Sequence, residues 1–274
     1  MGRPGCGHTP PAASISVVIP ARNEQLHLAA TVAAIHGALI SAGVQHELVV
    51  VDDHSTDSTW ELLSHLRSSV PTLRPLRNEY GAGYGFAVRY GLDHFAGDAV
   101  AIMMADGADD PHDLIRFIST LNEGYDCVFG SRFTGTTRTH GYPVVKLVAN
   151  RIGNWLIRTA VHSSYDDITN AFKLFRRTVI AGIQPLSSTD FSLCVELPVR
   201  TILAGYSYAV LPNRWTNKRR DSSRFRLSSM SRAYFRALRS CLAARAALAA
   251  QRQHGELSSI AYDYAPPSSD VLGH

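Results

Sequence analysis

Two neighbouring carboxylates, Asp52 and Asp53, stand directly after the apolar run Leu48–Val51. Such runs are typical of strands that are buried on both faces of a parallel sheet, and open α/β sheets bind ligands at the carboxyl ends of their strands. A carboxylate at that position accepts hydrogen bonds from a ribose hydroxyl or from an N–H group of a base. The spacing therefore predicts a nucleotide site. The alternative is that Asp53 or Ser55 caps a helix that begins near Thr59.

A second acid cluster follows the apolar run Ala99–Met104 and contains Asp106, Asp109 and Asp110. Mg²⁺ and Mn²⁺ prefer hard oxygen ligands, take one or two protein carboxylates and complete their shell with diphosphate oxygens and water. We therefore predict a divalent cation held by Asp106 and Asp109, which would neutralise a diphosphate leaving group as a sugar–phosphate bond breaks. Asp110 before Pro111 is also a good helix start, and the two interpretations are compatible.

The elements that must position these acids alternate along the chain. The apolar patterns predict strands over 14–19, 47–51, 73–77, 98–104, 126–129 and 206–211. They predict helices from residue 23, over 59–66, from 81–87 onward, over 113–123 and within 138–164. This order predicts an α/β fold whose mostly parallel, Rossmann-like sheet carries helices on both faces.

The chain of 274 residues, 45% of them hydrophobic, is long enough for one sizeable core. We expect a disordered tail over 1–13, one catalytic domain over 14–226, a basic amphipathic helix over 227–250 and a disordered tail over 251–274. The cysteines Cys6, Cys127, Cys194 and Cys241 have no metal-binding spacing, so we expect a reduced cytosolic compartment and no structural zinc. Neither a secretory signal nor a membrane-spanning run is expected.

The formal charge of +4 is unevenly distributed. Between residues 211 and 250 the only acid is Asp221. The basic residues in this range are Arg214, Lys218, Arg219, Arg220, Arg224, Arg226, Arg232, Arg236, Arg239 and Arg245. Such a basic block indicates binding to phosphate groups of a substrate, a lipid surface or a nucleic acid. One helical stripe contains Leu227, Met230, Tyr234, Leu238 and Leu242, and another contains Arg232, Arg236 and Arg239. This helix could lie in a membrane interface or pack its apolar stripe on the domain.

Four segments resemble, in the right order, motifs of family 2 glycosyltransferases with the GT-A fold: VVIPARNE at 17–24, VVDDHSTDST at 50–59, the acid cluster, and GSRF at 130–133. The likeness runs from about Ser14 to Phe235 and is greatest to polyprenyl- or dolichyl-phosphate mannosyl or glucosyl synthases. The resemblance implies that Asp52 and Asp53 hold the base and ribose of a nucleotide. It also implies that Pro20 and Glu24 border the base and that Arg132 lies beside a donor or acceptor phosphate. We expect Arg22, between them in the same motif, to belong to the nucleotide-binding residues as well.

The acid cluster departs from the pattern of the family. Where relatives have Met-Asp-x-Asp, this chain has Met103-Met104-Ala105-Asp106, and the Gln that in many relatives reaches the metal is Ala108. Two of three expected ligands are therefore apolar. We expect a shifted metal site made of Asp106 and Asp109; the alternative is a weakened or absent dependence on metal.

Two further segments resemble parts of the family that face the acceptor. Residues 166–173 match an Asp-x-x-Ser-Gly-Phe segment, with Asp167 at the position of its acid. Residues 191–205 match a helix that supplies an inward-facing glutamate, here Glu196. A buried carboxylate needs a partner, so Glu196 could be structural and pair with an arginine.

Residues 217–225 resemble a mobile basic loop of the family, with Lys218, Arg220, Ser223 and Arg224 at its basic and serine positions. Several cations on one loop can clamp a diphosphate and an anionic acceptor together by screening their repulsion. The alternative is a solvated basic linker.

These observations predict an inverting hexosyltransferase that uses Mg²⁺ or Mn²⁺ and moves a sugar from a GDP- or UDP-sugar to a polyprenyl phosphate. We expect it to act at the cytoplasmic face of an anionic membrane, as a cytoplasmic or peripheral inner-face protein, and to bind no nucleic acid. The catalytic roles fall to Asp106, Asp109, Asp167 and Arg220. A phosphate acceptor needs no strong general base, whereas a soluble or saccharide hydroxyl acceptor would need one, with Asp167 and Glu196 as candidates.

Two other classes of protein stay open at this point. A sugar-nucleotide nucleotidyltransferase also uses an α/β nucleotide fold and a cation, but it generally has a Gly-rich basic loop after its first strand, where this chain has residues 20–24. A non-catalytic sugar-nucleotide-binding module would explain the irregular metal motif. The motifs do not specify the sugar, because selectivity depends on the shape of the pocket.

Overall fold

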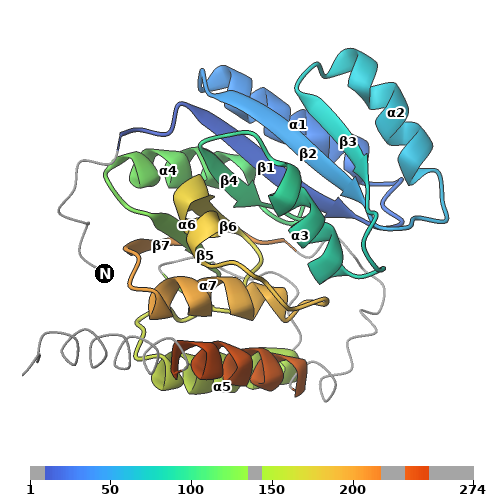
Figure 1. The fold of residues 1–274 in the computed structure, drawn as a ribbon. Helices are drawn as coiled ribbons and strands as arrows, with labels where there is room; N and C mark the ends of the chain where they lie inside the picture. Colours follow the sequence, from blue (N-terminus) through green and yellow to red (C-terminus); the bar gives the residue numbers. More distant parts are fainter. Residues whose placement is uncertain (1–9, 135–143, 217–231, 247–274) are drawn as a thin grey trace, which may run out of the picture.

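The computed structural model describes residues 10–134, 144–216 and 232–246. Within them, one seven-stranded sheet has the strand order β3-β2-β1-β4-β6-β5-β7 (Figure 1). The strands are β1 (Ser14–Ala21), β2 (Gln45–Asp52), β3 (Leu73–Arg77), β4 (Ala99–Ile102), β5 (Cys127–Ser131), β6 (Lys173–Arg176) and β7 (Tyr208–Pro212). The helices are α1 (Leu28–Ser41), α2 (Thr59–Ser69), α3 (Tyr84–His94), α4 (Pro111–Asn122), α5 (Val144–Ala160), α6 (Arg177–Gly182) and α7 (Leu193–Leu203), and a further helix covers 232–246.

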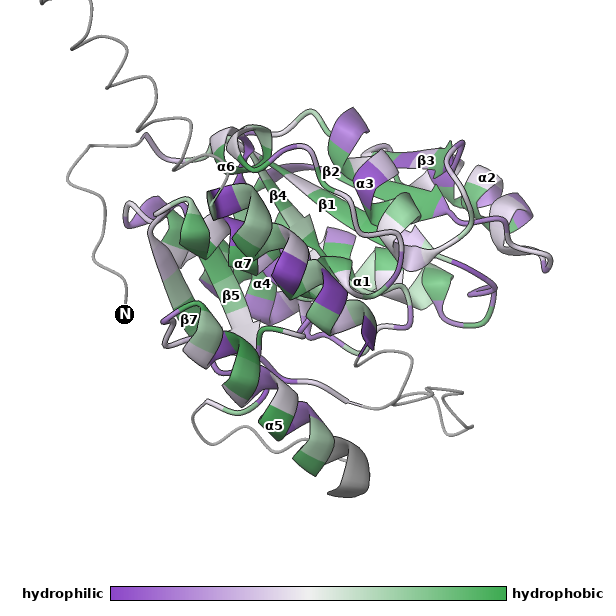
Figure 2. Ribbon diagram, turned by 60° about the horizontal axis from the view of Figure 1, so that its bottom comes forward, coloured by the Kyte–Doolittle hydropathy of each residue, from purple (hydrophilic) through white to green (hydrophobic). Residues whose placement is uncertain are grey.

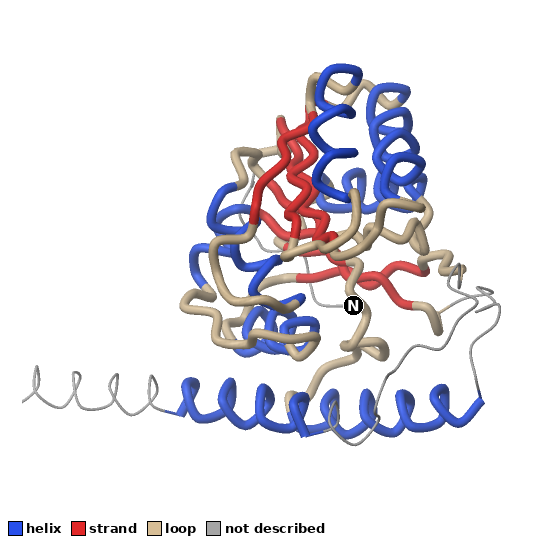
Figure 3. The backbone as a smooth tube through the Cα atoms, turned by 90° about the vertical axis from the view of Figure 1, so that its right-hand side faces the viewer, coloured by secondary structure: helices blue, strands red, loops and turns tan. Residues whose placement is uncertain are grey.

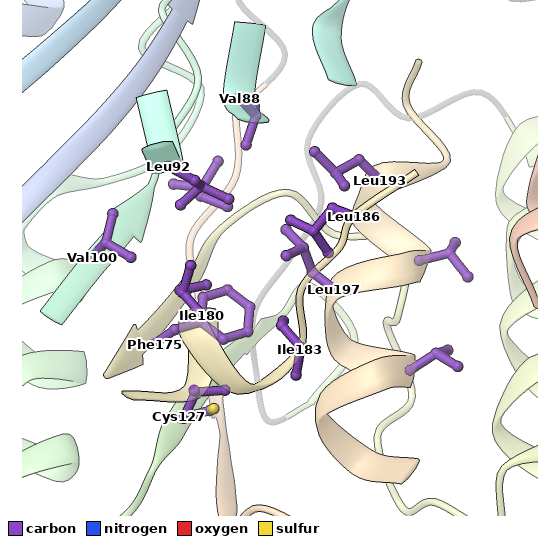
Figure 4. Packing of buried hydrophobic residues seen from close by; sticks show 14 of the residues in the cluster. Val88, Leu92, Val100, Cys127, Phe175, Ile180, Ile183, Leu186, Leu193 and Leu197 are labelled. Atoms are coloured by element: carbon purple, nitrogen blue, oxygen red, sulfur yellow. The ribbon is translucent and has the colours of Figure 1, made fainter. Parts of the chain in front are cut away.

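Apolar side chains of successive strand residues face opposite sides of the sheet. Val17 of β1 belongs to a buried cluster that includes residues of α1 and α4, whereas Val18 belongs to a second cluster that includes residues of α3 and α7. Figure 3 shows the strands lying between helices. In Figure 4, Leu92 of α3, Phe175 of β6 and Leu197 of α7 belong to the second cluster. The predicted α/β fold with helices on both faces is confirmed, and burial on both faces explains the apolar runs.

The strand β6 runs antiparallel to both of its neighbours, β4 and β5, while the other pairs are parallel. Its first residue, Lys173, pairs with Ile102 at the end of β4 and with Phe129 in β5. An antiparallel strand enters the sheet from the edge at which the parallel strands end. The segment before β6, which contains Asp167, therefore lies at the same edge as the acids that follow β2 and β4.

Several helix boundaries differ from those predicted. Helix α2 continues to Ser69 where the prediction ended at residue 66, and α4 covers Pro111–Asn122 where 113–123 was predicted. The helix expected from Asn23 begins at Leu28, because Asn23 has a left-handed backbone conformation with φ of 56° and cannot start a right-handed helix. The helix expected over 227–250 is seen over 232–246, and its remaining residues lie outside the described part of the chain.

The ordered domain begins before the predicted boundary at Ser14. The N–H of Ala12 donates to Asn122 Oδ1 (2.9 Å), and the N–H of Ala13 donates to Asp98 Oδ2 (3.0 Å). Residues 1–9 and 251–274, for which tails are predicted, lie outside the described residues, as do residues 247–250 of the predicted basic helix. Among the described helices, none has the length and apolar character needed to span a bilayer.

Candidate active site

The loops at the carboxyl ends of β1 and β2 are hydrogen-bonded to each other. Asn23 donates its N–H to Ser55 Oγ (3.0 Å), and its Oδ1 accepts the N–H of Thr56 (2.8 Å). Asparagine suits this position because its short polar side chain tolerates the left-handed region. Of the predicted nucleotide-binding residues in this region, Pro20 pairs with Val51 of β2 in the sheet. Arg22 Nη1 lies 3.7 Å from Asp53 Oδ2, and Glu24 donates its N–H to Thr59 Oγ1 (2.9 Å).

Asp53 holds the loop between β3 and α3. Its buried carboxylate accepts hydrogen bonds from Asn78 Nδ2 (2.9 Å) and from the N–H of Gly83 (3.0 Å), and Arg22 Nη1 lies 3.7 Å from it. Gly83 has a φ of 149°, and a Cβ atom there would lie 2.6 Å from the carbonyl oxygen of Thr189. Only glycine fits, so the Asp53 carboxylate and this glycine together fix the loop beside the predicted nucleotide site.

The alternative that Asp53 or Ser55 caps α2 is wrong. The N-cap of α2 is Ser58, and the N–H of Thr59 is bonded by Asp57 Oδ1 (3.0 Å). The capping function therefore belongs to residues that follow the two acids.

Asp52 carries a buried oxygen without a protein partner. The residue is 6% exposed, and within the described residues its Oδ1 makes no hydrogen bond. Leaving a buried acceptor unpaired costs about 1–3 kcal/mol, more for a charged group. An N–H or O–H donor on a bound ligand would remove that cost, so Asp52 has the chemistry of a ligand-binding acid and Asp53 that of its support.

The acids after β4 lie close together. Asp109 is buried, and burial together with the negative charge of Asp106 raises its pKa to about 7. Asp106 Oδ1 accepts the N–H of Ala108 (3.0 Å), and Gly107 between them has a φ of 65°. Repulsion between two carboxylates is the electrostatic condition that a cation relieves.

Asp110 caps α4 as predicted. Its Oδ1 accepts the N–H of His112 (2.9 Å), Pro111 occupies the first turn, and Arg214 Nη2 lies 3.1 Å from Oδ2. Because these bonds occupy the carboxylate of Asp110 in capping α4 and in the ion pair with Arg214, Asp106 and Asp109 are the candidate metal ligands.

The donor set fits Mg²⁺ or Mn²⁺ and does not fit a closed structural metal site. Within the described residues, no group of three or more His, Cys, Asp or Glu side chains is arranged to hold an ion. One or two carboxylates suffice where diphosphate oxygens and water complete the shell. Asp106 and Asp109 supply two, so any ion here would depend on the substrate for its other ligands.

Arg132 and Asp167 form a buried, bidentate ion pair. Arg132 Nε donates to Asp167 Oδ2 (2.8 Å), Nη2 donates to Oδ1 (2.7 Å), and the Arg132 N–H donates to Oδ2 (2.9 Å). The side chain of Asp167 is fully buried and that of Arg132 is 10% exposed. Asp167, predicted as catalytic, therefore orients Arg132 in this structure.

Lys173, the first residue of β6, was not among the predicted site residues. It is fully buried, and its Nζ donates to the carbonyl oxygens of Ile168 (3.1 Å) and Asn170. Burial lowers its pKa to about 8. These bonds close the turn that carries Asp167. The available signal was a lysine between Phe172 and Leu174, where a buried strand should be apolar.

Glu196 is structural, as the arginine-pairing alternative predicts. Arg200 Nε donates to its Oε1 (2.8 Å), and the N–H groups of Ser187 and Ser188 donate to its carboxylate (3.0 and 2.6 Å). Hydrogen bonds from Ser188 and Ser187 and the charge of Arg200 outweigh burial and lower the pKa of Glu196. A carboxylate with these partners is a poor general base.

Helix α5 exposes a row of large apolar side chains. The row consists of Val148, Ile152, Trp155 and Leu156, which are all more than half exposed. Residues spaced by three or four share one face of a helix. Figure 2 shows hydrophobic segments along α5, which lies at the outer side of the domain. A contiguous exposed apolar face on a folded domain indicates a contact surface.

The helix over 232–246 packs its apolar stripe on the domain. Leu238 and Cys241 are buried in the same cluster as Ile157 of α5, and Tyr234 and Leu242 pack against that cluster. Its outer face exposes Phe235 together with Arg232, Arg236, Arg239 and Arg245. For the described part of this helix, packing on the domain is therefore the correct alternative for the apolar stripe. The arginines remain on the outside.

The predicted phosphate clamp, Lys218, Arg220, Ser223 and Arg224, lies outside the described residues, as do Leu227 and Met230. The structure brings Asp52, Asp53, Asp106, Asp109, Asp167 and Arg132 to one edge of the sheet.

Comparisons with known proteins agree with this geometry. The family described as glycosyl transferase family 2 matches residues 16–183. A dolichol-phosphate mannosyltransferase of Pyrococcus furiosus is 29% identical over 68% of this chain and 52% of its own length. A polyprenol monophosphomannose synthase of Mycolicibacterium smegmatis is 29% identical over 85% of this chain and 90% of its own length. The chain thus spans about half of the archaeal relative and most of the mycobacterial one.

A third relative is an undecaprenyl-phosphate 4-deoxy-4-formamido-L-arabinose transferase of Klebsiella pneumoniae, 28% identical over 69% of this chain and 60% of its own length. Among solved structures, glucosyl-3-phosphoglycerate synthase of Mycobacterium tuberculosis in complex with Mg²⁺ and uridine diphosphate superposes with a TM-score of 0.64 at 20% identity. That match covers 84% of this chain and 79% of the other. At this level of identity the likeness shows a shared fold.

Proposed function

The chain belongs to glycosyl transferase family 2, and on this basis we propose that it moves a sugar from a nucleoside diphosphate sugar to the phosphate of a polyprenyl lipid at the cytoplasmic face of a membrane. As a glycosyltransferase it is not a nucleotidyltransferase or a binding module, which sets those two alternatives aside. All three relatives are named for the phosphate of a long isoprenoid alcohol, and this supports the lipid acceptor.

The exposed apolar row of α5 is the observation that carries the proposal. Four large side chains facing water cost hydrophobic free energy, which burial in the interfacial layer of a bilayer would recover. The exposed arginines of the helix over 232–246 supply the cationic component that an anionic membrane attracts. Together they would hold the domain on a surface that presents a polyprenyl phosphate.

The two candidate general bases support an acceptor that is already ionised. Asp167 is held by Arg132, and Glu196 is held by Arg200 and two backbone N–H groups. A hydroxyl acceptor would need a carboxylate that is free to take its proton, whereas a phosphate acceptor would not. The described residues thus favour the phosphate over the hydroxyl.

The donor end is assigned to the edge where β1 and β2 finish. The open Oδ1 of Asp52 would accept an N–H of the base or a hydroxyl of the ribose, and Asp53 would keep the loop at Gly83 in place. Pro20, Arg22 and Glu24 would border the same pocket. Both guanine and uracil carry a suitable N–H, so this assignment covers GDP- and UDP-sugars alike.

Asp106 and Asp109 would hold Mg²⁺ or Mn²⁺, and two structures of similar fold contain one of these ions with uridine diphosphate. When bound, the ion would supply charge neutralisation for the leaving diphosphate. In the transfer step, an oxygen of the acceptor phosphate forms a bond to the anomeric carbon of the sugar while the bond from that carbon to the diphosphate breaks. The configuration at the anomeric carbon is thereby inverted. Arg132, oriented by Asp167, lies at the same edge and would stabilise the phosphate charges, joined by Lys218, Arg220, Ser223 and Arg224.

The test is transfer of a radiolabelled sugar into an organic phase. The full chain, with Mn²⁺, is offered GDP- and UDP-sugars and vesicles that contain polyprenyl phosphate. Label that partitions with the lipid and is lost in Asp52→Ala, but retained in the control variant Glu61→Ala, an exposed acid of α2, supports the proposal. Label that appears only with a water-soluble acceptor would overturn the lipid assignment.

A further inference from the structure

Two buried asparagines join the turn that carries Asp167 to the candidate metal ligand Asp109. Asn170 belongs to that turn and is 3% exposed, and Asn213, directly after β7, is 1% exposed. Asn170 Nδ2 donates to Asn213 Oδ1 (2.9 Å), and Asn213 Nδ2 donates to Asp109 Oδ1 (3.4 Å). A continuous series of three side chains therefore lies at the edge of the sheet where the acids are found.

The main chain fixes the orientation of both amide groups. Asn170 Oδ1 accepts the N–H of Phe172 (3.1 Å), and Asn170 Nδ2 donates to the carbonyl oxygen of Gly130 (2.8 Å). A main-chain N–H only donates and a carbonyl only accepts, so the oxygen and the nitrogen of the Asn170 amide cannot exchange places. Because Asn170 Nδ2 then donates to Asn213 Oδ1, the amide nitrogen of Asn213 is the atom that faces Asp109.

The main chain around Asn213 is attached to the same parts of the site. The Asn213 N–H donates to the carbonyl oxygen of Ser131 (3.1 Å) at the end of β5. Two residues further along the chain, Trp215 forms an antiparallel bridge with Asp109. Asn213 is therefore held in place beside the acid that its side chain contacts.

Gly130 provides the space that the two amides occupy. A Cβ atom at this position would lie 2.9 Å from Asn213 Oδ1 and 3.1 Å from Asn170 Nδ2. Both distances are shorter than an ordinary van der Waals contact, so a side chain here would displace the amide pair, and glycine permits the close approach. The GSRF motif at 130–133 thus supplies Arg132 and also makes room for the two asparagines.

We propose that Asn213 is a positioning residue of the candidate metal site, whose amide, itself oriented by Asn170, orients the Asp109 carboxylate for Mg²⁺ or Mn²⁺. Carboxylates that bind metals are held by hydrogen bonds from neighbouring groups, and loss of such a partner costs about 10- to 100-fold in metal affinity. The separation of 3.4 Å is long for a hydrogen bond, so we expect an effect at the lower end of this range. The inference rests on the proposed function, to which this metal site belongs.

The test measures Mn²⁺ binding without turnover. Electron paramagnetic resonance of the full chain, with GDP and separately with UDP, gives the fraction of Mn²⁺ that is bound. Calorimetry in EDTA gives the affinity for the same nucleotides without metal. The variant is Asn213→Ala, which removes the amide and adds no bulk. The matched control is Thr201→Ala, which truncates another fully buried polar side chain, on α7.

We expect Asn213→Ala to weaken Mn²⁺ binding about tenfold and to keep the nucleotide affinity of wild type in EDTA, whereas Thr201→Ala should change neither. A general loss of structure would lower both affinities together. If Asn213→Ala does not fold, Asn213→Ser decides, because its hydroxyl is too short to reach Asp109. The double variant with Asn170→Ala should bind Mn²⁺ no more weakly than the weaker single variant, and additive losses would overturn the role of Asn170.

Asp109→Asn separates this inference from the proposed metal site. If Asp109→Asn weakens Mn²⁺ binding while Asn213→Ala binds Mn²⁺ like wild type, the role of Asn213 is overturned and the metal site stands. If Asp109→Asn binds Mn²⁺ as tightly as wild type, the metal assignment in the proposed function is wrong, and the role of Asn213 is overturned with it.

Discussion

Arg132 and Asp167, which are 35 positions apart, meet through two parallel side-chain hydrogen bonds of 2.8 and 2.7 Å, with Asp167 fully buried. We expect Asp167→Asn to destabilise the fold by about 3–5 kcal/mol, because it leaves a buried guanidinium without its charge partner. Turnover should fall while nucleotide affinity changes little, since Arg132 is misplaced and Asp52 is untouched. Denaturant unfolding and single-turnover assays measure the two effects.

The pH profile distinguishes a positioning role for Asp167 from a role as general base. If Asp167 positions Arg132, the residual activity of Asp167→Asn keeps the pH profile of wild type. Disappearance of the acidic limb of that profile would instead identify Asp167 as the base.

Asp52 and Asp53 should respond differently to substitution by alanine. Asp52→Ala removes an acceptor that has no protein partner, so nucleotide affinity should fall by about 1–3 kcal/mol with little loss of stability. Asp53→Ala removes the support of Asn78 and Gly83, so both stability and affinity should fall. Calorimetry with the nucleotide and urea unfolding would show this. Equal stability losses in the two variants would contradict the division of roles.

The Mn²⁺ requirement should depend on Asp109 and on pH. Asp109→Asn should raise the Mn²⁺ concentration for half-maximal turnover, whereas Asp110→Asn should leave it nearly unchanged, because asparagine also caps a helix. The pKa of Asp109 is about 7, so the acid is increasingly ionised between pH 6 and pH 8, and less Mn²⁺ should be needed at the higher pH. Wild-type turnover that survives a chelator would show the metal assignment to be wrong.

Vesicle attachment should depend on the exposed row of α5. Trp155→Ser should weaken sedimentation with anionic vesicles at least about tenfold, because burying a large apolar side chain is worth about 1.5–3 kcal/mol and about 1.4 kcal/mol corresponds to a factor of ten. Ile40→Ser, which removes a similarly exposed residue of α1, serves as the control. Binding should also weaken with salt through the arginines of the helix over 232–246. Equal attachment of the two variants would mean that α5 does not contact the bilayer.

Lys173 should make stability rise with pH. Its pKa is about 8 in the folded protein, below its ordinary value of 10.5, so between these values the unfolded chain binds the extra proton. The free energy of unfolding contributed by this group therefore increases as pH rises through that window. Lys173→Met should lack the increase, and guanidinium unfolding at pH 7.5 to 9.5 compares the two slopes. Parallel slopes would show that Lys173 does not titrate there.

Local pattern by itself determined the α/β class, most of the strands and the acids at their ends. Apolar runs such as Leu48–Val51 report burial on both faces, and a strand that ends in Asp52 places that acid at the carboxyl edge wherever the strand lies in the sheet. The same reasoning found the cap at Asp110, because capping depends only on residues next to it in the chain.

Tertiary structure determined which of those residues is left open for a ligand and which supports the fold. The antiparallel insertion of β6 between β4 and β5 brings Asp167 to Arg132 and buries Lys173. The pattern of apolar residues along the sequence does not predict which strands will be neighbours in the sheet. Asp52 and Asp53 are adjacent and chemically identical, yet only the loop at Gly83 makes one a support and leaves the other open. Hydrogen bonds and burial between distant segments exist only after packing, so the sequence specified the groups present and the fold determined their partners.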